Sequence, residues 1–136
     1  MPDRTAVTPA GIPHHPDLPP GMKVGSFLFI SGQVATDVFN MGNVVGGNDF
    51  EAQARKAVSN LRAIIEAGGA TMQDVAKITT FILNVDDYPA WAKVRAESWP
   101  DDPPASSTVV VRDLVGKHVG APGLLIEIEA IVRVPD

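Results

Sequence analysis

The chain has 136 residues, long enough for one domain with a substantial core and too short for two ordinary domains. Hydrophobic residues make up 45% of it and charged residues 20%, a composition typical of globular rather than disordered proteins. Acidic residues outnumber basic ones by 16 to 11, for a net charge of −5, and no Lys/Arg run is present, which argues against binding to a nucleic-acid backbone.

The N-terminal residues 1–23 are rich in proline and glycine and predict an extended arm. Proline fixes φ and lacks a backbone donor, so this stretch excludes a long helix and a central strand. The stretch SFLFISGQV (26–34) that follows predicts a short apolar strand that stops at Gly32. NMGNVVGGNDF (40–50) predicts a turn, a brief strand around 44–45 and a Gly-Gly turn.

A first helix is predicted next, because Asn48 and Glu51 form a capping-box pattern and Gly68–Gly69 can end the segment. The apolar residues that share one face of this helix are Phe50, Ala54, Ala57, Leu61, Ile64 and Ile65. DVAKITTFILNV (74–85) is rich in β-branched residues and predicts a long strand.

A second helix is predicted after Asp86 and Asp87, which can cap it, and prolines from position 100 onward end it. Trp91 and Trp99 lie on one stripe of this helix with Tyr88 and Arg95. Tryptophans at helical spacing are more often part of a core than a stacking platform, so we assign them to the core.

STVVV (107–111) and GLLIEIEAIVRV (123–134) predict the last two strands, with a long loop between them. Strands and helices interleave irregularly, so the expected fold class is α+β: one mixed sheet with both helices on one face. The other face of the sheet then has to be buried elsewhere, and a homo-oligomer is the natural way to bury it.

Glu127 and Glu129 are a candidate site because strand alternation places both on one face, roughly 7 Å apart. If that face is partly buried, desolvation and mutual repulsion raise the pKa of at least one carboxyl and make it a plausible proton shuttle. The alternative is a solvated face with two ordinary surface glutamates. On the strand alone, the solvated face is the preferred interpretation.

The three histidines do not form a convincing metal site. His14 and His15 are adjacent in an extended segment and therefore point to opposite sides, while His118 lies far along the chain. No metal and no cofactor are expected. Ser106, Ser107 and Thr108 would need a partnered base for nucleophilic catalysis, and His118 is only a candidate for that role.

The chain contains no cysteine, which excludes disulfides, thiolate nucleophiles and thiolate metal sites. No apolar run approaches the roughly 20 residues that a membrane span requires, and the N-terminus lacks the apolar segment of a signal peptide. A cytoplasmic protein that binds neither membranes nor nucleic acid is expected.

Four stretches together resemble the RidA/YjgF/UK114 family: FLFISGQVATD, EAQARKAVSNLRAIIEAGGATMQDVAKITTFILNVDDYPAW, PPASSTVVV and LLIEIEAIV. The resemblance covers about residues 24–134 in order and spacing. It implies a chorismate-mutase-like α+β fold and a homotrimer with a central barrel and ligand clefts between subunits. It also implies cofactor-free hydrolysis of reactive enamines and imines, such as 2-aminoacrylate, to 2-oxo acids and ammonia.

The resemblance places the family's catalytic glutamate at Glu127 and its substrate-binding arginine, in the motif P-A-R-S, at Ser106. Ser31 and Gly32 match cleft-lining residues, and Ser107–Thr108 match the two positions after the arginine. A serine hydroxyl cannot replace a bidentate, permanently charged guanidinium. We therefore expect the cleft to keep the shape that the resemblance implies but to lack the positive charge of the family's arginine.

Two further departures from the family pattern concern the cleft. His14 or His15 stands where the family has an aromatic ring, and the loop before the last strand is longer than usual. We assign His15 and His118 to the ligand-binding residues. Arg112 and Lys117 are possible relocated cations, and neither is preferred.

The favoured function is a small-molecule hydrolase or deaminase of enamine or imine substrates with altered specificity, in which Glu127 is the general acid/base. The alternative is a non-catalytic trimer that binds a small metabolite. An endoribonuclease, an activity sometimes ascribed to relatives, is disfavoured by the acidic balance and by the absence of a basic patch with aromatic residues.

Overall fold

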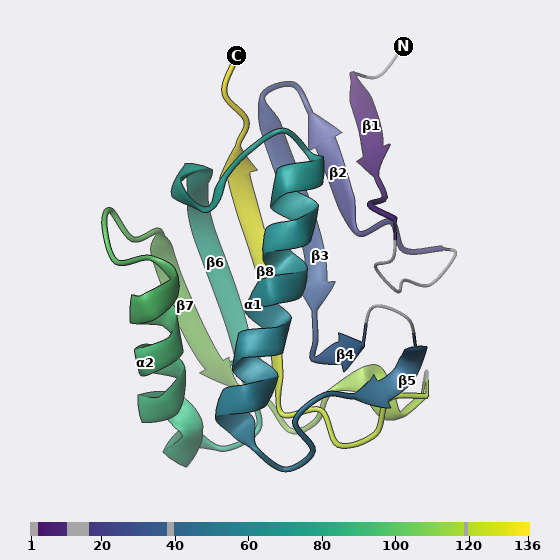
Figure 1. Ribbon diagram of the computed structural model, residues 1–136, viewed down its shortest axis with the longest axis vertical. Coiled ribbons are helices and arrows are strands. Elements are labelled where there is room, and N and C mark those ends of the chain that lie inside the picture. The colour runs from purple at the N-terminus through teal and green to yellow at the C-terminus, as the bar shows by residue number, and fades with distance from the viewer. Residues whose placement is uncertain (1–2, 11–16, 38–39, 119) are drawn as a thin grey trace.

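The computed structural model describes residues 3–10, 17–37, 40–118 and 120–136. Six strands form one mixed sheet in the spatial order β1-β2-β3-β8-β6-β7 (Figure 1). Their bounds are β1 Arg4–Val7, β2 Gly21–Val24, β3 Phe27–Gln33, β6 Val75–Ile82, β7 Ala105–Val110 and β8 Ile126–Arg133. All neighbours are antiparallel except β6 and β7, which are parallel. A separate two-stranded ribbon pairs β4 (Thr36–Asp37) with β5 (Asn40–Val44).

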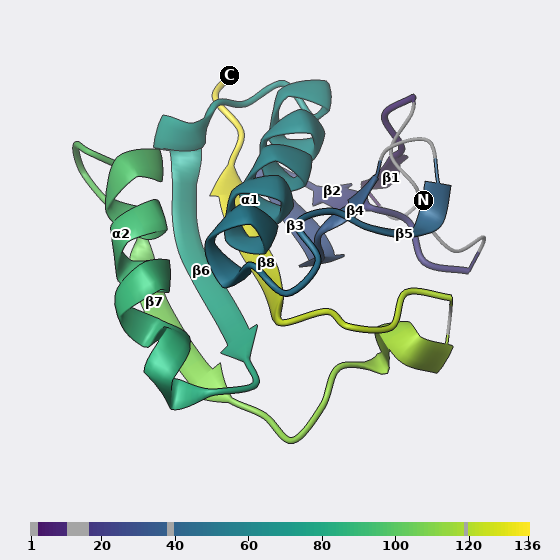
Figure 2. The ribbon, with the colours of Figure 1, turned by 60° about the horizontal axis from the view of Figure 1, so that its bottom comes forward.

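Two α-helices, α1 (Phe50–Ala67) and α2 (Tyr88–Ser98), lie side by side on one face of the six-stranded sheet (Figures 1 and 2). The α+β class with both helices on one face is therefore confirmed. Short 3-10 helices η1 (Met72–Asp74), η2 (Val85–Asp87) and η3 (Val115–His118) occupy the connections. Within the described residues, no helix is both long and apolar enough to cross a membrane.

Helix α1 buries the apolar face that its sequence predicts, since all six residues of that face are buried in the core. The predicted cap was wrong by one residue: Asp49, not Asn48, is the N-cap, and its carboxylate accepts a hydrogen bond from the Ala52 amide at 3.2 Å. At the other end Gly69 has φ of +88°, a conformation that favours glycine and stops the helix.

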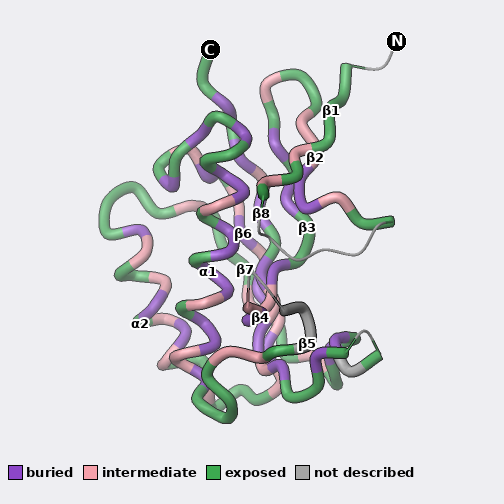
Figure 3. The backbone as a smooth tube through the Cα atoms, turned by 45° about the vertical axis from the view of Figure 1, so that its right-hand side comes forward, coloured by how far each residue is buried: buried purple, intermediate pink, exposed green. Residues whose placement is uncertain are grey.

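The main core lies between the helices and the sheet, where buried residues of both layers meet (Figure 3). Strand β8 alternates strictly. Ile126, Ile128, Ala130 and Val132 are buried beneath the helices, and the residues between them lie on the opposite face. The tryptophans belong to the core as expected, and Trp99 donates its indole N–H to the Met72 carbonyl at 2.9 Å.

The face of the sheet away from the helices is here called the open face. Register partners on neighbouring strands share a face, so the register assigns residues of all six strands to it. They are Arg4, Ala6, Met22, Val24, Phe27, Phe29, Lys77, Thr79, Phe81, Ala105, Ser107, Val109, Glu127, Glu129, Ile131 and Arg133.

The segment predicted as an extended arm contributes two strands to this sheet. β1 pairs with β2, and β2 pairs with β3, so that β1 forms one edge of the sheet. Because β2 is paired on both sides, the expectation that this segment forms no central strand was wrong. The nearest prolines, at positions 19 and 20, precede β2 and remove no hydrogen bond from its ladder. His14 and His15 lie outside the described residues.

Candidate functional site

Glu127 and Gly32 meet on neighbouring strands. Ile30 of β3 pairs with Ala130 of β8, but Gln33 pairs with Ile128, so β3 contains one extra residue across positions 31 and 32. Such a bulge bends the strand and redirects side chains, and bulges are frequent beside active sites. A methyl group placed at position 32 would lie 2.6 Å from Cδ and 2.9 Å from Cγ of Glu127. The absent side chain of Gly32 therefore provides the space that the Glu127 carboxyl occupies.

The electrostatic environment distinguishes the two glutamates of the β8 pair. Glu127 is half-buried and lies opposite Phe81 of β6, whereas Glu129 is exposed. Burial raises the pKa of the Glu127 carboxyl above its ordinary value, and the nearby negative charge of Glu129 raises it further. Glu127 therefore has the environment that acid/base chemistry requires, which an ordinary solvated glutamate would lack.

The chain just before Glu127 is fixed by a buried glutamine of α1. The Gln53 side-chain amide donates to the carbonyls of Gly47 and Gly123, at 2.8 Å each, and its oxygen accepts from the Leu125 amide at 2.8 Å. These bonds join the N-terminal turn of α1 to the end of the long loop. Leu125 precedes Glu127 by two residues, so they also restrain the backbone that carries the carboxyl.

The long loop between β7 and β8 packs on the same end of the sheet. A second apolar cluster is built from this loop, from the end of β3 and from the neighbouring strands. Its buried members are Ala35, Leu114, Ala121 and Leu124, and Phe81 packs against them. Since Phe81 is also the register partner of Glu127, the loop and the carboxyl lie at one end of the open face.

Ser31, predicted to line the cleft, is held in the bulge by the segment before β2. Its hydroxyl donates to the Pro19 carbonyl at 2.8 Å and its amide donates to the Pro20 carbonyl at 2.9 Å. The Ser31 carbonyl in turn accepts from the Gln33 side-chain amide at 3.0 Å. Ser31 therefore fixes the backbone beside Gly32, and the structure brings Ser31, Gly32 and Glu127 together.

Ser106 and Thr108 point away from Glu127. In the parallel register of β7 and β6, Ser106 is opposite Ile78 and Thr108 is opposite Thr80. Ile78 and Thr80 are fully buried on the helix side of the sheet, so the side chains of Ser106 and Thr108 lie on that side as well. Glu127 is on the open face, and a single chain therefore does not bring Ser106 and Glu127 into one site.

Two hydroxyls at the β6–β7 junction have no hydrogen-bond partner among the described residues. They are the buried Oγ1 atoms of the paired Thr80 and Thr108. A buried hydroxyl without a partner costs free energy, so an ordered water or a bound molecule supplies the missing bond in such places. β7 is the outermost strand of the sheet on this side, where such a molecule could approach.

Ser107 differs from its neighbours because it lies on the open face and has a cationic partner. Lys77 of β6 donates from Nζ to Ser107 Oγ at 2.8 Å. Arg112 and Lys117 are the cations predicted from the sequence, and Lys77 was not predicted. Strand alternation was the signal that could have found it, because Lys77 lies two residues from Thr79 and four from Phe81 on one face of β6.

The remaining predicted residues are not brought to Glu127. His118 is exposed at the end of η3, and Arg112 is exposed just after β7. In the described part of the chain neither forms a hydrogen bond or an ion pair with Glu127 or Ser106. Among the described residues, no group of three or more His, Cys, Asp or Glu side chains could hold a metal ion.

Comparison with known proteins gives consistent matches over almost the whole chain. The family model described as Endoribonuclease L-PSP matches residues 14–134. A RutC family protein of Pyrococcus horikoshii is 37% identical over 110 residues, covering 81% of each chain. A protein of Dermatophagoides farinae named 2-iminobutanoate/2-iminopropanoate deaminase is 38% identical over 111 residues, which is 82% of this chain and 80% of the relative.

Solved structures match the fold over nearly its full length. A protein of the conserved Rid family from Yersinia pestis aligns with a TM-score of 0.84 and 27% identity, covering 96% of this chain and 99% of that one. RidA from an Antarctic Psychrobacter aligns with a TM-score of 0.77 and 28% identity, covering 98% and 99%.

Proposed function

The chain belongs to the endoribonuclease L-PSP family, which is also the RidA/YjgF family, and from this membership we propose that it hydrolyses small imines and their enamine tautomers. The name of the Dermatophagoides farinae relative, an imine deaminase, supports this reaction class. The observation that carries the proposal is the half-buried Glu127 carboxyl, seated against Gly32 with a raised pKa.

Hydrolysis of an imine needs one group that both gives and takes protons. Water adds its oxygen to the imine carbon, while the nitrogen gains a proton and becomes the amine of a carbinolamine. The carbinolamine then loses ammonia, its hydroxyl proton is removed, and a carbonyl group remains. Protonated Glu127 donates to the nitrogen, and the resulting carboxylate accepts a proton from the water or the hydroxyl. A raised pKa lets a carboxyl hold its proton at a higher pH than an ordinary glutamate and so serve as donor in one step and acceptor in the other.

Ser106 supports a specificity different from that of relatives with an arginine. A guanidinium binds a substrate carboxylate through two charge-assisted hydrogen bonds, which one hydroxyl cannot replace. Losing such a contact in a buried site costs about 2–5 kcal/mol, or roughly thirty-fold to several-thousand-fold in rate. We therefore propose substrates without a carboxylate at this place, and inefficient turnover of 2-aminoacrylate.

A homotrimer would complete the site. Phe27 and Phe29 are each 45% exposed and Val24 is 43% exposed, all on the open face, where another copy would bury them. Ser106 and Glu127 lie on opposite faces of one sheet, so a cleft that contains both needs two copies. We propose that the cleft forms between subunits, with Glu127 and Gly32 from one copy and Ser106 and Thr108 from the next.

The test measures the release of ammonia from two imines that are generated in the assay. One is 2-iminopropanoate, and the other is an imine of similar size without a carboxylate. The wild-type protein should favour the uncharged imine, and Ser106→Arg should shift the ratio of kcat/KM values toward 2-iminopropanoate. A ratio of kcat/KM values that is the same in the wild type and in Ser106→Arg would contradict the role assigned to Ser106. Saturable binding of both imines without turnover would overturn the hydrolase and favour the metabolite-binding alternative.

A further inference from the structure

A groove on the helical side of the molecule forms a second candidate binding site, away from Glu127. It has a volume of about 330 Å³ and lies between α1 and α2. Its lining residues are Arg55, Val58, Ser59 and Arg62 of α1 and Val94 and Ser98 of α2. The helices cover the face of the sheet opposite the open face, so a trimer built on the open face would leave this groove accessible.

The polar residues of α1 in this groove share one face of the helix. Arg55 precedes Ser59 by four residues and Arg62 follows it by three, so the three side chains occupy successive turns of one helical face. Arginine side chains are long enough to reach over the turn between them. Helical side chains lean toward the N-terminus, so Arg62 leans over Ser59, whereas Arg55 can offer a ligand there only the donors that its own ion pairs leave.

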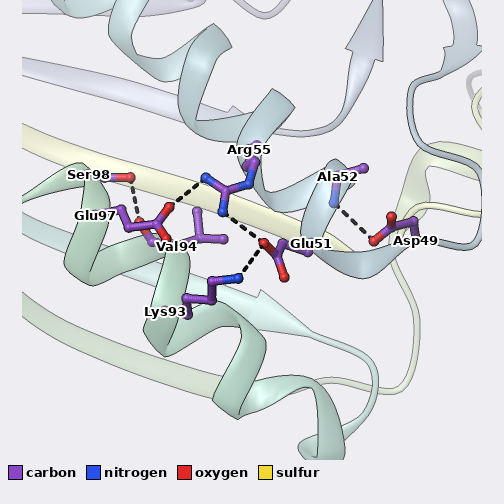
Figure 4. A network of polar contacts seen from close by, with 8 residues as sticks. All are labelled: Asp49, Glu51, Ala52, Arg55, Lys93, Val94, Glu97 and Ser98. Atoms are coloured by element: carbon purple, nitrogen blue, oxygen red, sulfur yellow. Dashed lines mark hydrogen bonds and ion pairs between the residues drawn. The ribbon is translucent and has the colours of Figure 1, made fainter.

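Arg55 is oriented by an ion-pair network that spans both helices (Figure 4). Its Nη1 lies 2.6 Å from Glu97 Oε2 and its Nη2 lies 2.8 Å from Glu51 Oε1, which also accepts from Lys93 Nζ at 3.0 Å. A guanidinium carries five N–H donors, so these two bonds leave donors available for a ligand. The hydrogen bonds to Arg55 lower the pKa of Glu51 and of Glu97, so both are ionised at neutral pH.

Two of the cations around the groove are already paired with carboxylates. Arg55 and Lys93 pair with the two glutamates of the network, and Arg62 lies outside it. Arg62 is exposed, and no described residue lies within ion-pair distance of it. Val58 and Val94, both buried, form an apolar floor beneath these charges.

We propose that this groove binds a small organic phosphate. The phosphate lies above Ser59 between the guanidiniums of Arg55 and Arg62, and the organic part packs on Val58 and Val94. A phosphate monoester suits the site because its several acceptor oxygens accept from more than one guanidinium and from a hydroxyl at once. The groove volume lies at the lower end of the range for small-molecule sites, about 300–1,000 Å³, which limits the ligand to a small one.

The probe is phenyl phosphate, which joins a phosphate to a ring that can cover the apolar floor. Binding is measured by NMR amide shifts and by calorimetry at fixed ionic strength, with phenol and inorganic phosphate as separate arms. Phenyl phosphate should bind saturably and shift amides of α1 and α2. Phenol should not bind, and inorganic phosphate should bind several-fold more weakly. Equal affinity for inorganic and phenyl phosphate would contradict the role of the apolar floor.

The decisive variant is Arg62→Gln, and Arg4→Gln is its control. Both replace an exposed arginine and change the net charge equally, but Arg4 is in the edge strand β1, outside the groove. Arg62→Gln should weaken phenyl phosphate binding about tenfold or more, whereas Arg4→Gln should change it little. Equal weakening by both variants, no saturable binding, or shifts confined to the surroundings of Glu127 would each overturn the proposal. Ammonia release by Arg62→Gln should match the wild type, which separates this site from the proposed hydrolase.

Discussion

Replacing Gly32 by alanine tests the contact on which the Glu127 site depends. Gly32 is not among the glycines with positive φ, so alanine brings no backbone strain and acts only through its methyl group. That methyl would lie 2.6 Å from Glu127 Cδ and 2.9 Å from Cγ, whereas carbon atoms prefer separations of about 3.5–4.0 Å. The Glu127 side chain must therefore move by about 1 Å, which is the shortfall between these distances.

Two quantities should change. Crowding of this kind costs about 1–3 kcal/mol of unfolding free energy, at the lower end here because the glutamate can rotate. A displacement of about 1 Å at a reacting group can lower the rate on the order of a hundredfold. Urea denaturation measures the first effect and ammonia release from the uncharged imine measures the second.

A double-mutant cycle identifies the cause of the loss. Gly32→Ala is introduced into the wild type and into Glu127→Ala, which lacks the atoms that the methyl would meet. The stability cost of Gly32→Ala should largely disappear in the Glu127→Ala background. An equal cost in both backgrounds would refute the reasoning, because the methyl would then be clashing with something other than Glu127.

Three further predictions concern stability and assembly. Burial raises the pKa of Glu127 in the folded chain above its ordinary value of 4.5. The free energy of unfolding therefore falls as the pH rises from below 4.5 through the raised pKa of the folded chain. Glu127→Gln should therefore be more thermostable than the wild type at pH 7, with an advantage that shrinks below about pH 4.5; an advantage independent of pH would contradict the assigned shift. Asp49→Ala should lower the unfolding free energy by about 1 kcal/mol, while Asn48→Ala should leave it nearly unchanged, because only Asp49 caps α1. Light scattering should give three times the 14.4 kDa chain mass for the wild type and a lower mass for Phe29→Glu; a monomeric wild type would contradict the proposed trimer.

Periodicity was sufficient to predict the elements that form the core. The apolar positions of α1 recur at helical spacing, and those of β8 alternate, because both elements bury one face. The cap of α1 was misplaced because Asn48 and Asp49 are both good capping residues and only the backbone selects between them. β1 was missed because its four residues are largely exposed, and its conformation depends on pairing with β2.

The candidate site was predictable only in part. Alternation alone placed Glu127 and Glu129 on one face, but it could not say which of them is buried. That difference depends on the bulge beside Gly32 and on the distant loop that packs on Phe81, neither of which has a local sequence signal. The orientation of Ser106 depends on the parallel register between β7 and β6, which the sequence does not specify.

The measurement that tests the central claim most directly is ammonia release from the uncharged imine by the wild type and by Glu127→Gln under identical conditions. Glutamine keeps the size of the side chain but cannot exchange the proton, so the rate should fall by about a hundredfold or more. Circular dichroism and light scattering should show the same fold and the same oligomer for both proteins. A Glu127→Gln variant that turns over at the wild-type rate would contradict the account.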